Sequence, residues 1–447
     1  MERNLTTGSV WRTVVSFSLP YLLSYFLQTL YGMADLFIIG RFNGVESTTA
    51  VSIGSQVMHM LTVIIVGLAM GSTVLIGQAV GREDRRETAQ VTGNTVTLFM
   101  VVSLAMTAGL LWSVDGIVAV MSTPAAAVPG TRAYLMVCFA GIPFITAYNI
   151  ISSVLRGMGD SKSPMYFVAA ACVVNIGLDC LFIGKMSLGP MGAALGTTLS
   201  QTASVLLALG TMARRRSGPA LALQDLRPQK RTMARLLKIG LPVAAQDGFI
   251  QVAFIVITVI ANRRGLDDAA AVGIVEKVIG ILFLVPSSML SAVSALSAQN
   301  IGAGRPDRAR LTLRYAVCIA VGWGIFASLV MTAAAEPFVG LFADSSTAPN
   351  VIRLGGQYMR GYVWDCIFAG VHFCFSGYFC ACGLSGISFV HNSLSILCVR
   401  IPVAYFASAR FAETLFPMGL ASPAGSMLSV LICAGAYLWL LRREEKI

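Results

Sequence analysis

Residues 17–41 read FSLPYLLSYFLQTLYGMADLFIIGR, an apolar stretch that carries Pro20 near its start and Asp35 towards its end. A helix needs about 20 mainly apolar residues to cross the hydrocarbon core of a bilayer. This stretch is long enough to span a membrane, and comparable stretches recur along the chain. We therefore predict twelve transmembrane helices, near residues 14–40, 50–78, 94–113, 132–155, 164–184, 191–213, 237–262, 270–298, 314–334, 356–381, 386–408 and 418–441.

The composition supports an all-α integral membrane protein. Of the 447 residues, 56% are hydrophobic and 12% are charged, whereas a soluble protein has about 25% charged residues. Most Lys and Arg residues fall in alternate loops, which predicts that both termini are cytoplasmic. We expect a multi-pass protein of a bacterial-type plasma (inner) membrane. The net charge of +11 does not indicate a nucleic-acid partner, because the basic residues do not gather on one soluble element.

The chain repeats itself at an offset of about 222 residues. Residues 17–28 (FSLPYLLSYFLQ) match residues 239–251 (IGLPVAAQDGFIQ), and residues 77–86 (GQAVGREDRR) match residues 298–310 (AQNIGAGRPDRAR). Because six spans is an even number, the second half enters the membrane in the same orientation as the first. The fold we predict is therefore two six-helix lobes related as parallel repeats.

The predicted organisation has three parts. The N-lobe covers 1–213, a cytoplasmic basic linker covers 214–236, and the C-lobe covers 237–447. A linker of this kind permits one lobe to rock against the other, as alternating access requires. Pro20 and Pro242 each remove a helix hydrogen bond inside a span, so we predict hinges there; a kink satisfied by neighbouring helices is the alternative.

Four polar residues at membrane depth form the main candidate site. An acid in the bilayer is costly and usually faces a cavity or a partner. Asp35 and Asp179 are such acids, Asn175 precedes Asp179 by four residues on the same helix face, and Thr197 lies in the next span. These oxygens suit a small cation such as Na⁺, or one shared proton. The alternative is that each acid lies near a helix end and is solvated.

A second polar site is possible in the C-lobe. Asp365 and His372 are seven residues apart and share a helix face, although cavity lining or solvation at a helix end explains them as well. Gln28 and Gln251 are candidates for the lining of a substrate cavity. The repeat partners of Asp35 and Asp179 are not acids, so we expect ion coupling in the N-lobe. Other ionisable residues in or near the spans are Glu276 and Lys277, Asp247, Arg400 and the lone histidines His59 and His391. Glu276 and Lys277 lie early in span 8, which places them either at headgroup level or within the span.

These motifs together resemble the multidrug and toxic compound extrusion (MATE) transporters of the multidrug/oligosaccharidyl-lipid/polysaccharide superfamily. The resemblance rests on the two LP pairs, ADLFIIGR at 34–41, the GQAVGR and QNIGAG loops, LRGMGDSKSPM at 155–165, and N-x-x-x-D followed by GPMGAALGT. It implies a V-shaped pair of six-helix bundles that exports organic cations in exchange for H⁺ or Na⁺. It also implies that Asp35, Asp179, Asn175 and Thr197 hold the coupling cation. The acid that one branch of the family has in span 7 is not evident here.

We therefore expect a secondary active multidrug efflux transporter, acting as a monomer among membrane lipids on small organic cations or drugs. It needs no cofactor besides the coupling ion and is not an enzyme. A lipid-linked oligosaccharide flippase is the nearest alternative, but it would need a strongly cationic central cavity. An intramembrane prenyltransferase would need a second Asp-rich Mg²⁺ motif, which the sequence lacks. A channel is the remaining alternative.

Overall fold

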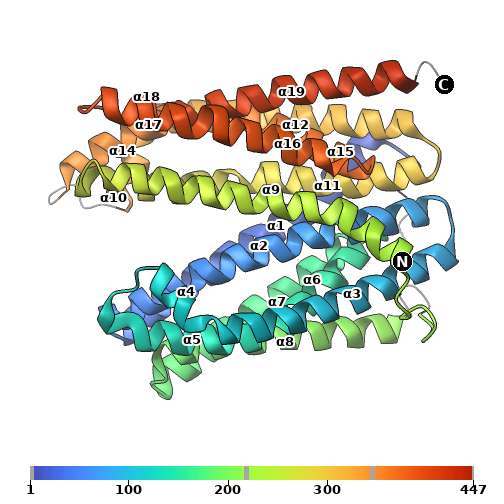
Figure 1. The fold of residues 1–447 in the computed structure, drawn as a ribbon, viewed down its shortest axis with the longest axis horizontal. Coiled ribbons are helices and arrows are strands. Elements are labelled where there is room, and N and C mark those ends of the chain that lie inside the picture. The colour runs from blue at the N-terminus through green and yellow to red at the C-terminus, as the bar shows by residue number, and fades with distance from the viewer. Residues whose placement is uncertain (1–4, 216–220, 343–347, 445–447) are drawn as a thin grey trace. The chain divides into compact units, whose positions relative to one another are not determined.

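The computed structural model describes residues 5–215, 221–342 and 348–444, and in these ranges the chain is helical with no strand (Figure 1). Within these ranges, ten helices are long and apolar enough to cross a membrane, and the number of spans is twelve if each of two bent helix pairs is one span. The prediction of an all-α membrane protein is confirmed.

The helices are α1 (Val10–Phe42), α2 (Val45–Gly81), α3 (Arg85–Trp112), α4 (Val114–Val120), η1 (Ala125–Ala127), α5 (Val128–Ala140), α6 (Ile142–Gly157), α7 (Lys162–Asp179), η2 (Cys180–Lys185), α8 (Gly189–Arg215), α9 (Lys230–Asn262), α10 (Leu266–Leu282), α11 (Leu284–Gly302), α12 (Pro306–Ala333), α13 (Ala335–Gly340), α14 (Pro349–Tyr362), α15 (Asp365–Ala381), α16 (Ser385–Ser395), η3 (Ile396–Arg400), α17 (Ile401–Arg410), α18 (Phe416–Gly419) and α19 (Ala421–Glu444).

The chain packs into two compact units that do not follow a single cut in the sequence. Unit 1 holds Leu19–Ala244 and Ala298–Gly304 with the N-terminal residues up to Thr7; unit 2 holds Gly8–Ser18, Ala245–Ser297 and the chain from Arg305 onward. Three helices, α1, α9 and α11, therefore each contribute to both units. The division into an N-lobe at 1–213 and a C-lobe at 237–447 stays a prediction, and so does the V-shaped arrangement of the two lobes.

Both units repeat the same packing. In unit 1, α3 packs on α6 and α2 on α5; in unit 2, α12 packs on α15 and α10 on α14. Two irregularities also recur. The fourth and tenth spans bend, by 48° between α5 and α6 and by 43° between α14 and α15. The fifth and eleventh spans each contain a π-helical turn, η2 and η3. These matches agree with a duplicated six-span unit.

Glycines allow helix backbones to touch within unit 1. A Cβ at Gly71 of α2 would lie 2.4 Å from the Leu236 carbonyl oxygen, and a Cβ at Gly240 of α9 would lie 2.3 Å from the Leu68 carbonyl oxygen. No real Cβ fits at those distances, so any larger residue would separate α2 from α9. The first part of α9 is held to unit 1 in this way.

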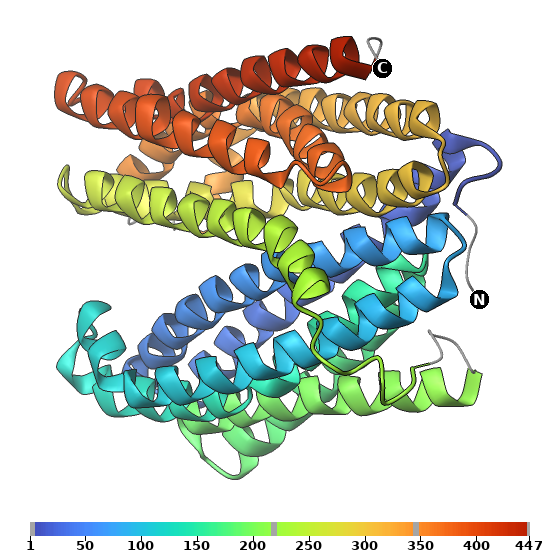
Figure 2. The same cartoon turned by 45° about the vertical axis from the view of Figure 1, so that its right-hand side comes forward.

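The described part of the linker is docked on unit 1 (Figure 2). The Asn94 side chain on α3 donates to the Asp225 carbonyl at 3.4 Å and accepts from the Gln229 amide at 2.7 Å. Thr97, one turn further along α3, donates to the Leu226 carbonyl at 2.7 Å. The linker is therefore not a free tether over these residues. Helix α9 begins at Lys230 rather than at 237, and linker residues 216–220 lie outside the described ranges.

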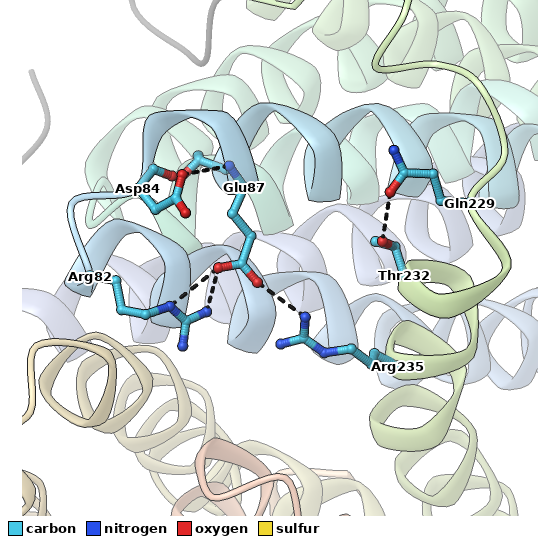
Figure 3. Close-up of polar contacts among 7 residues, drawn as sticks. Arg82, Asp84, Glu87, Gln229, Thr232 and Arg235 are labelled. Atoms are coloured by element: carbon cyan, nitrogen blue, oxygen red, sulfur yellow. Dashed lines mark hydrogen bonds and ion pairs between the residues drawn. The ribbon is translucent and has the colours of Figure 1, made fainter.

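An ion-pair cluster adds to this attachment (Figure 3). Glu87, in the first turn of α3, pairs with Arg82 at the end of α2 and with Arg235 of α9, at 2.7 and 3.0 Å. Asp84 caps α3 by accepting from the Glu87 amide at 2.8 Å. The side chains of all three paired residues are partly exposed, so each pair contributes about 1 kcal/mol or less.

Candidate cation site

Three helices of unit 1 bring the four predicted residues together. Asp35 lies on α1, Asn175 and Asp179 lie at the end of α7, and Thr197 lies on α8. The Thr197 hydroxyl donates to Asp35 Oδ2 at 3.2 Å. The Asp35 carboxyl also lies beside the side chains of Asp179 and Asn175. Residues from distant parts of the sequence thus meet at one place.

The polar atoms of this site are buried and short of partners. Asp35, Asn175 and Asp179 are 4%, 1% and 0% exposed. Within the described part of the chain, Asp35 Oδ1, both Asp179 oxygens and both polar atoms of the Asn175 amide have no hydrogen-bond partner. A buried polar atom without a partner costs about 1–3 kcal/mol. The arrangement is therefore suited to a proton or a cation that oxygen ligands can bind.

Gly196, which sequence reasoning did not single out, makes this packing possible. A Cβ at Gly196 would lie 2.1 Å from Asp179 Oδ1 and 3.6 Å from the Asn175 amide nitrogen. The glycine preceding Thr197 therefore lets the Asp179 carboxyl approach α8. The sequence does show a Gly-Thr pair inside an apolar run. The importance of the glycine could not be seen there, because it depends on Asp179 from another helix.

The backbone is irregular directly after Asp179. Helix α7 ends at that residue and η2 (Cys180–Lys185) continues the span with π-type turns. Single π turns inside α-helices widen the helix locally and occur often at functional sites. In unit 2 the corresponding η3 ends at Arg400. The same irregular turn is thus next to an acid in one unit and holds a base in the other.

Arg400 organises the polar residues of unit 2. Its side chain is 7% exposed, donates to the Tyr362 hydroxyl, and has its guanidinium carbon 4.9 Å from the centre of the Phe254 ring. It interacts electrostatically with Glu276 and Asp365. Glu276 is bonded to Thr258 at 3.3 Å. The sequence left Glu276 either at headgroup level or deeper in its span, and the structure adds that its carboxylate belongs to a mostly buried cluster.

The second predicted polar site contains His391 in addition to the predicted residues Asp365 and His372. Asp365 is 1% exposed and begins α15, and His372 is 4% exposed two turns later. His372 packs against the ring of His391, so His391 is not a lone histidine. Sequence reasoning missed this pair, because the two rings come from different helices.

The remaining predicted residues take separate places. Gln28 is partly buried on α1 in unit 1, and Gln251 is partly buried on α9 in unit 2. Pro20 and Pro242 lie inside α1 and α9. Helix α1 passes from unit 2 to unit 1 between Ser18 and Leu19, and α9 passes from unit 1 to unit 2 after Ala244. Each predicted hinge proline is therefore within two residues of the point where its helix changes unit.

Comparison with known proteins identifies the family. The chain is 27% identical over 417 residues to the probable multidrug resistance protein YpnP of Bacillus subtilis, with 93% of each chain covered. It is 23% identical to the multidrug export protein MepA of Staphylococcus haemolyticus, covering 91% of this chain and 89% of that one. Its fold matches an outward-facing multidrug resistance MATE family transporter with a TM-score of 0.90, at 22% identity and with 98% and 97% covered.

The family model described as MatE matches residues 20–181 and 242–406. These two segments cover most of the chain and correspond to its two repeats. The multi-pass helical fold and both matched segments lead to one conclusion: the chain belongs to the MatE family of multidrug and toxic compound extrusion transporters.

Proposed function

We propose that this protein exports amphipathic, often cationic organic compounds in exchange for H⁺ or Na⁺ that binds at Asp35 and Asp179. The observation that carries the proposal is that two buried carboxyls and an amide lie close together beside the Thr197 hydroxyl. The carboxyl groups and the amide all have oxygens without a hydrogen-bond partner in the described structure. Relatives named as multidrug resistance and multidrug export proteins support the substrate class.

The chemistry of the site follows from its charge. Two neighbouring carboxylates in a low-dielectric interior repel each other, so a proton or Na⁺ between them is favoured. The Thr197 hydroxyl orients Asp35, and the Asn175 carbonyl oxygen adds a neutral ligand of the kind that Na⁺ accepts. Antiport requires only that ion and drug favour different conformations.

The energy that drives efflux depends on the net charge moved. When one ion is exchanged for one neutral compound, a potential of 100 mV supplies about 2.3 kcal/mol, enough for roughly a fiftyfold concentration ratio. When one ion is exchanged for one monovalent cation, no net charge crosses the membrane and the concentration gradient of the ion alone drives efflux. We further propose that the protein works by alternating access, as a monomer in a bacterial inner membrane with both termini in the cytoplasm. The excess of Lys and Arg in alternate loops supports that orientation.

The test uses purified full-length protein in proteoliposomes loaded with ethidium. Efflux is driven separately by a pH gradient and by a Na⁺ gradient. Asp35→Asn and Asp179→Asn should each lower the efflux driven by the coupling ion at least tenfold. Asp115→Asn is the matched control, because Asp115 is an exposed acid paired with Arg132 at 2.7 Å; it should leave efflux unchanged.

Two results would contradict the proposal. Full ion-driven efflux in the Asp35→Asn/Asp179→Asn double variant would remove the ion site from these residues. Absence of ethidium efflux with either ion, together with movement of a lipid-linked oligosaccharide across the same vesicles, would favour the flippase alternative.

A further inference from the structure

A pair of buried histidines in unit 2 has no part in the function proposed above. His372 of α15 and His391 of α16 are 4% and 0% exposed. Their ring centroids are 5.5 Å apart, and the ring planes are inclined by 71°. Two imidazoles are thus in contact inside a helical unit, away from bulk water.

The hydrogen bonds of the pair are incomplete. The Ser376 hydroxyl is 3.0 Å from His391 Nε2, but Nδ1 of His391 and Nδ1 of His372 have no partner among the described residues. A neutral imidazole has one donor and one acceptor nitrogen. Two buried ring nitrogens are therefore left without the bonds that would satisfy them, and both belong to the residue type that most readily exchanges a proton near neutral pH.

The backbone around the pair is well fixed. The Ser429 hydroxyl of α19 donates to the His391 carbonyl at 3.2 Å, and the Ser388 hydroxyl of α16 donates to the Ser376 carbonyl at 3.4 Å. The ring of Phe373 packs against His372 with 4.9 Å between centroids. Three helices, α15, α16 and α19, therefore hold the two imidazoles together rather than leaving their contact to chance.

The charged surroundings limit what the pair can bind. The charged group that acts on His372 is Arg400 on η3. Other titratable groups on the helices packed around the pair include Asp365, Cys366, Cys374, Tyr378 and Cys380 on α15, Arg314, Tyr315 and Cys318 on α12, and Cys433 and Tyr437 on α19. Arg400 acts directly on His372, and two imidazolium ions in contact would repel each other. A second positive charge on the pair is therefore disfavoured more strongly than a first.

A metal ion is a poorer fit than a proton. Structural and catalytic zinc sites use three or four protein ligands, and the residues that the structure describes contain no group of three or more His, Cys, Asp or Glu able to hold a metal. A proton needs only one lone pair, and a second imidazole nearby can share it. The ligand that matches the pair is one proton.

We propose that His372 and His391 form a second proton-binding site, which takes up a single proton as unit 2 changes conformation. An imidazolium is poorly solvated in the packing seen here, so protonation favours a conformation in which the pair meets water or the Asp365 carboxylate. Binding that differs between two conformations couples the proton to the conformational change. This site is separate from Asp35 and Asp179, and its test does not depend on theirs.

The test exploits the small number of histidines. The chain has three, His59, His372 and His391, so full-length protein with ¹⁵N-labelled imidazole rings gives three sets of signals by solid-state NMR in lipid bilayers. The signals are assigned with His59→Gln, His372→Gln and His391→Gln variants. A titration from pH 9 to pH 5 should show one proton taken up by the pair in total. Removal of either partner should change the proton affinity of the other at least tenfold.

A second measurement reports on coupling. In protein in detergent-lipid micelles, ethidium addition should release fewer protons from His372→Gln and His391→Gln than from wild type or the His59→Gln control. The proposal is overturned if both imidazoles stay neutral down to pH 5 with and without ethidium. It is also overturned if each takes up its own proton at a pH that does not change when the other is removed. Two of the three variants are enough to assign the three wild-type signals by difference, so one variant that fails to fold leaves the wild-type titration intact.

Discussion

Gly81 and Gly302 occupy equivalent places in the two repeats and make reciprocal contacts. A Cβ at Gly81 of α2 would lie 2.1 Å from the Gln299 carbonyl oxygen of α11, and a Cβ at Gly302 of α11 would lie 2.1 Å from the Gln78 carbonyl oxygen of α2. Both glycines come from the matching GQAVGR and QNIGAG segments. The repeat is thus visible as a two-way backbone contact within unit 1.

This contact predicts that alanine is not tolerated at either glycine. Gly81→Ala and Gly302→Ala should each destabilise the protein by about 1–3 kcal/mol, because the added methyl meets a backbone atom that cannot move aside. Thermal unfolding in detergent with a lipid supplement measures the effect. Gly109→Ala is the control, since a Cβ there meets nothing within 4 Å and alanine is favoured in a helix. An unchanged melting temperature in both test variants would refute the close contact.

Gly196→Ala should damage the cation site without unfolding the helix. The methyl group would lie 2.1 Å from Asp179 Oδ1 and so push the carboxyl away from α8. Ion-driven ethidium efflux should fall at least tenfold. Gly210→Ala on the same helix is the matched control, because nothing lies within 4 Å of its Cβ position. If the Gly196→Ala variant keeps full efflux and this efflux still depends on the coupling ion, Asp179 does not need to approach α8.

The hydroxyl of Thr197 can be tested against its neighbour. Thr197→Val removes the 3.2 Å hydrogen bond to Asp35 but keeps the side-chain shape, so the concentration of coupling ion giving half-maximal efflux should rise about three- to tenfold. Thr198→Val is the control, because the Thr198 hydroxyl is buried with no partner in the described structure and its loss should leave that concentration unchanged. Equal effects of the two substitutions would argue against a role for the Thr197 bond.

The docked linker gives a prediction about local exchange. Asn94→Ala removes the acceptor of the Gln229 amide and one donor to Asp225, so amide hydrogens in residues 222–229 should exchange with solvent faster. Hydrogen–deuterium exchange read by mass spectrometry measures this. Glu87→Gln should have a smaller effect there, because its partly exposed ion pairs hold Arg82 and Arg235 rather than the linker backbone. If Asn94→Ala leaves exchange in this segment unchanged, the side-chain contacts do not hold the linker.

The sequence predicted the features that depend on local spacing. Long apolar runs predicted the spans, and the four-residue spacing of Asn175 and Asp179 placed both on one helix face. The sequence repeat predicted that the two halves have equivalent helices. It did not predict the bends and π turns, which the structure shows at equivalent places in both halves. The meeting of Asp35 with Thr197 could not follow from spacing, because they are 162 positions apart; the family resemblance supplied it.

The features that were missed depend on which helices become neighbours. The electrostatic partner of Glu276 could not be found from its position in the span, because Arg400 is far along the chain. His391 seemed lone because its partner lies across a turn on another helix. The sequence indicates a linker between the lobes, but its proline and basic residues give no sign of the Asn94 and Thr97 side chains that bind it. Pairings of this kind require the fold.

Unit 1 is built from segments that are far apart in the sequence, so the ribosome synthesises them at different times. Its last segment, Ala298–Gly304, is supplied by α11, which leaves the ribosome long after α2. Until then the surface of α2 at Gly81 lacks this backbone contact. Unit 1 is therefore complete only once most of unit 2 has been synthesised.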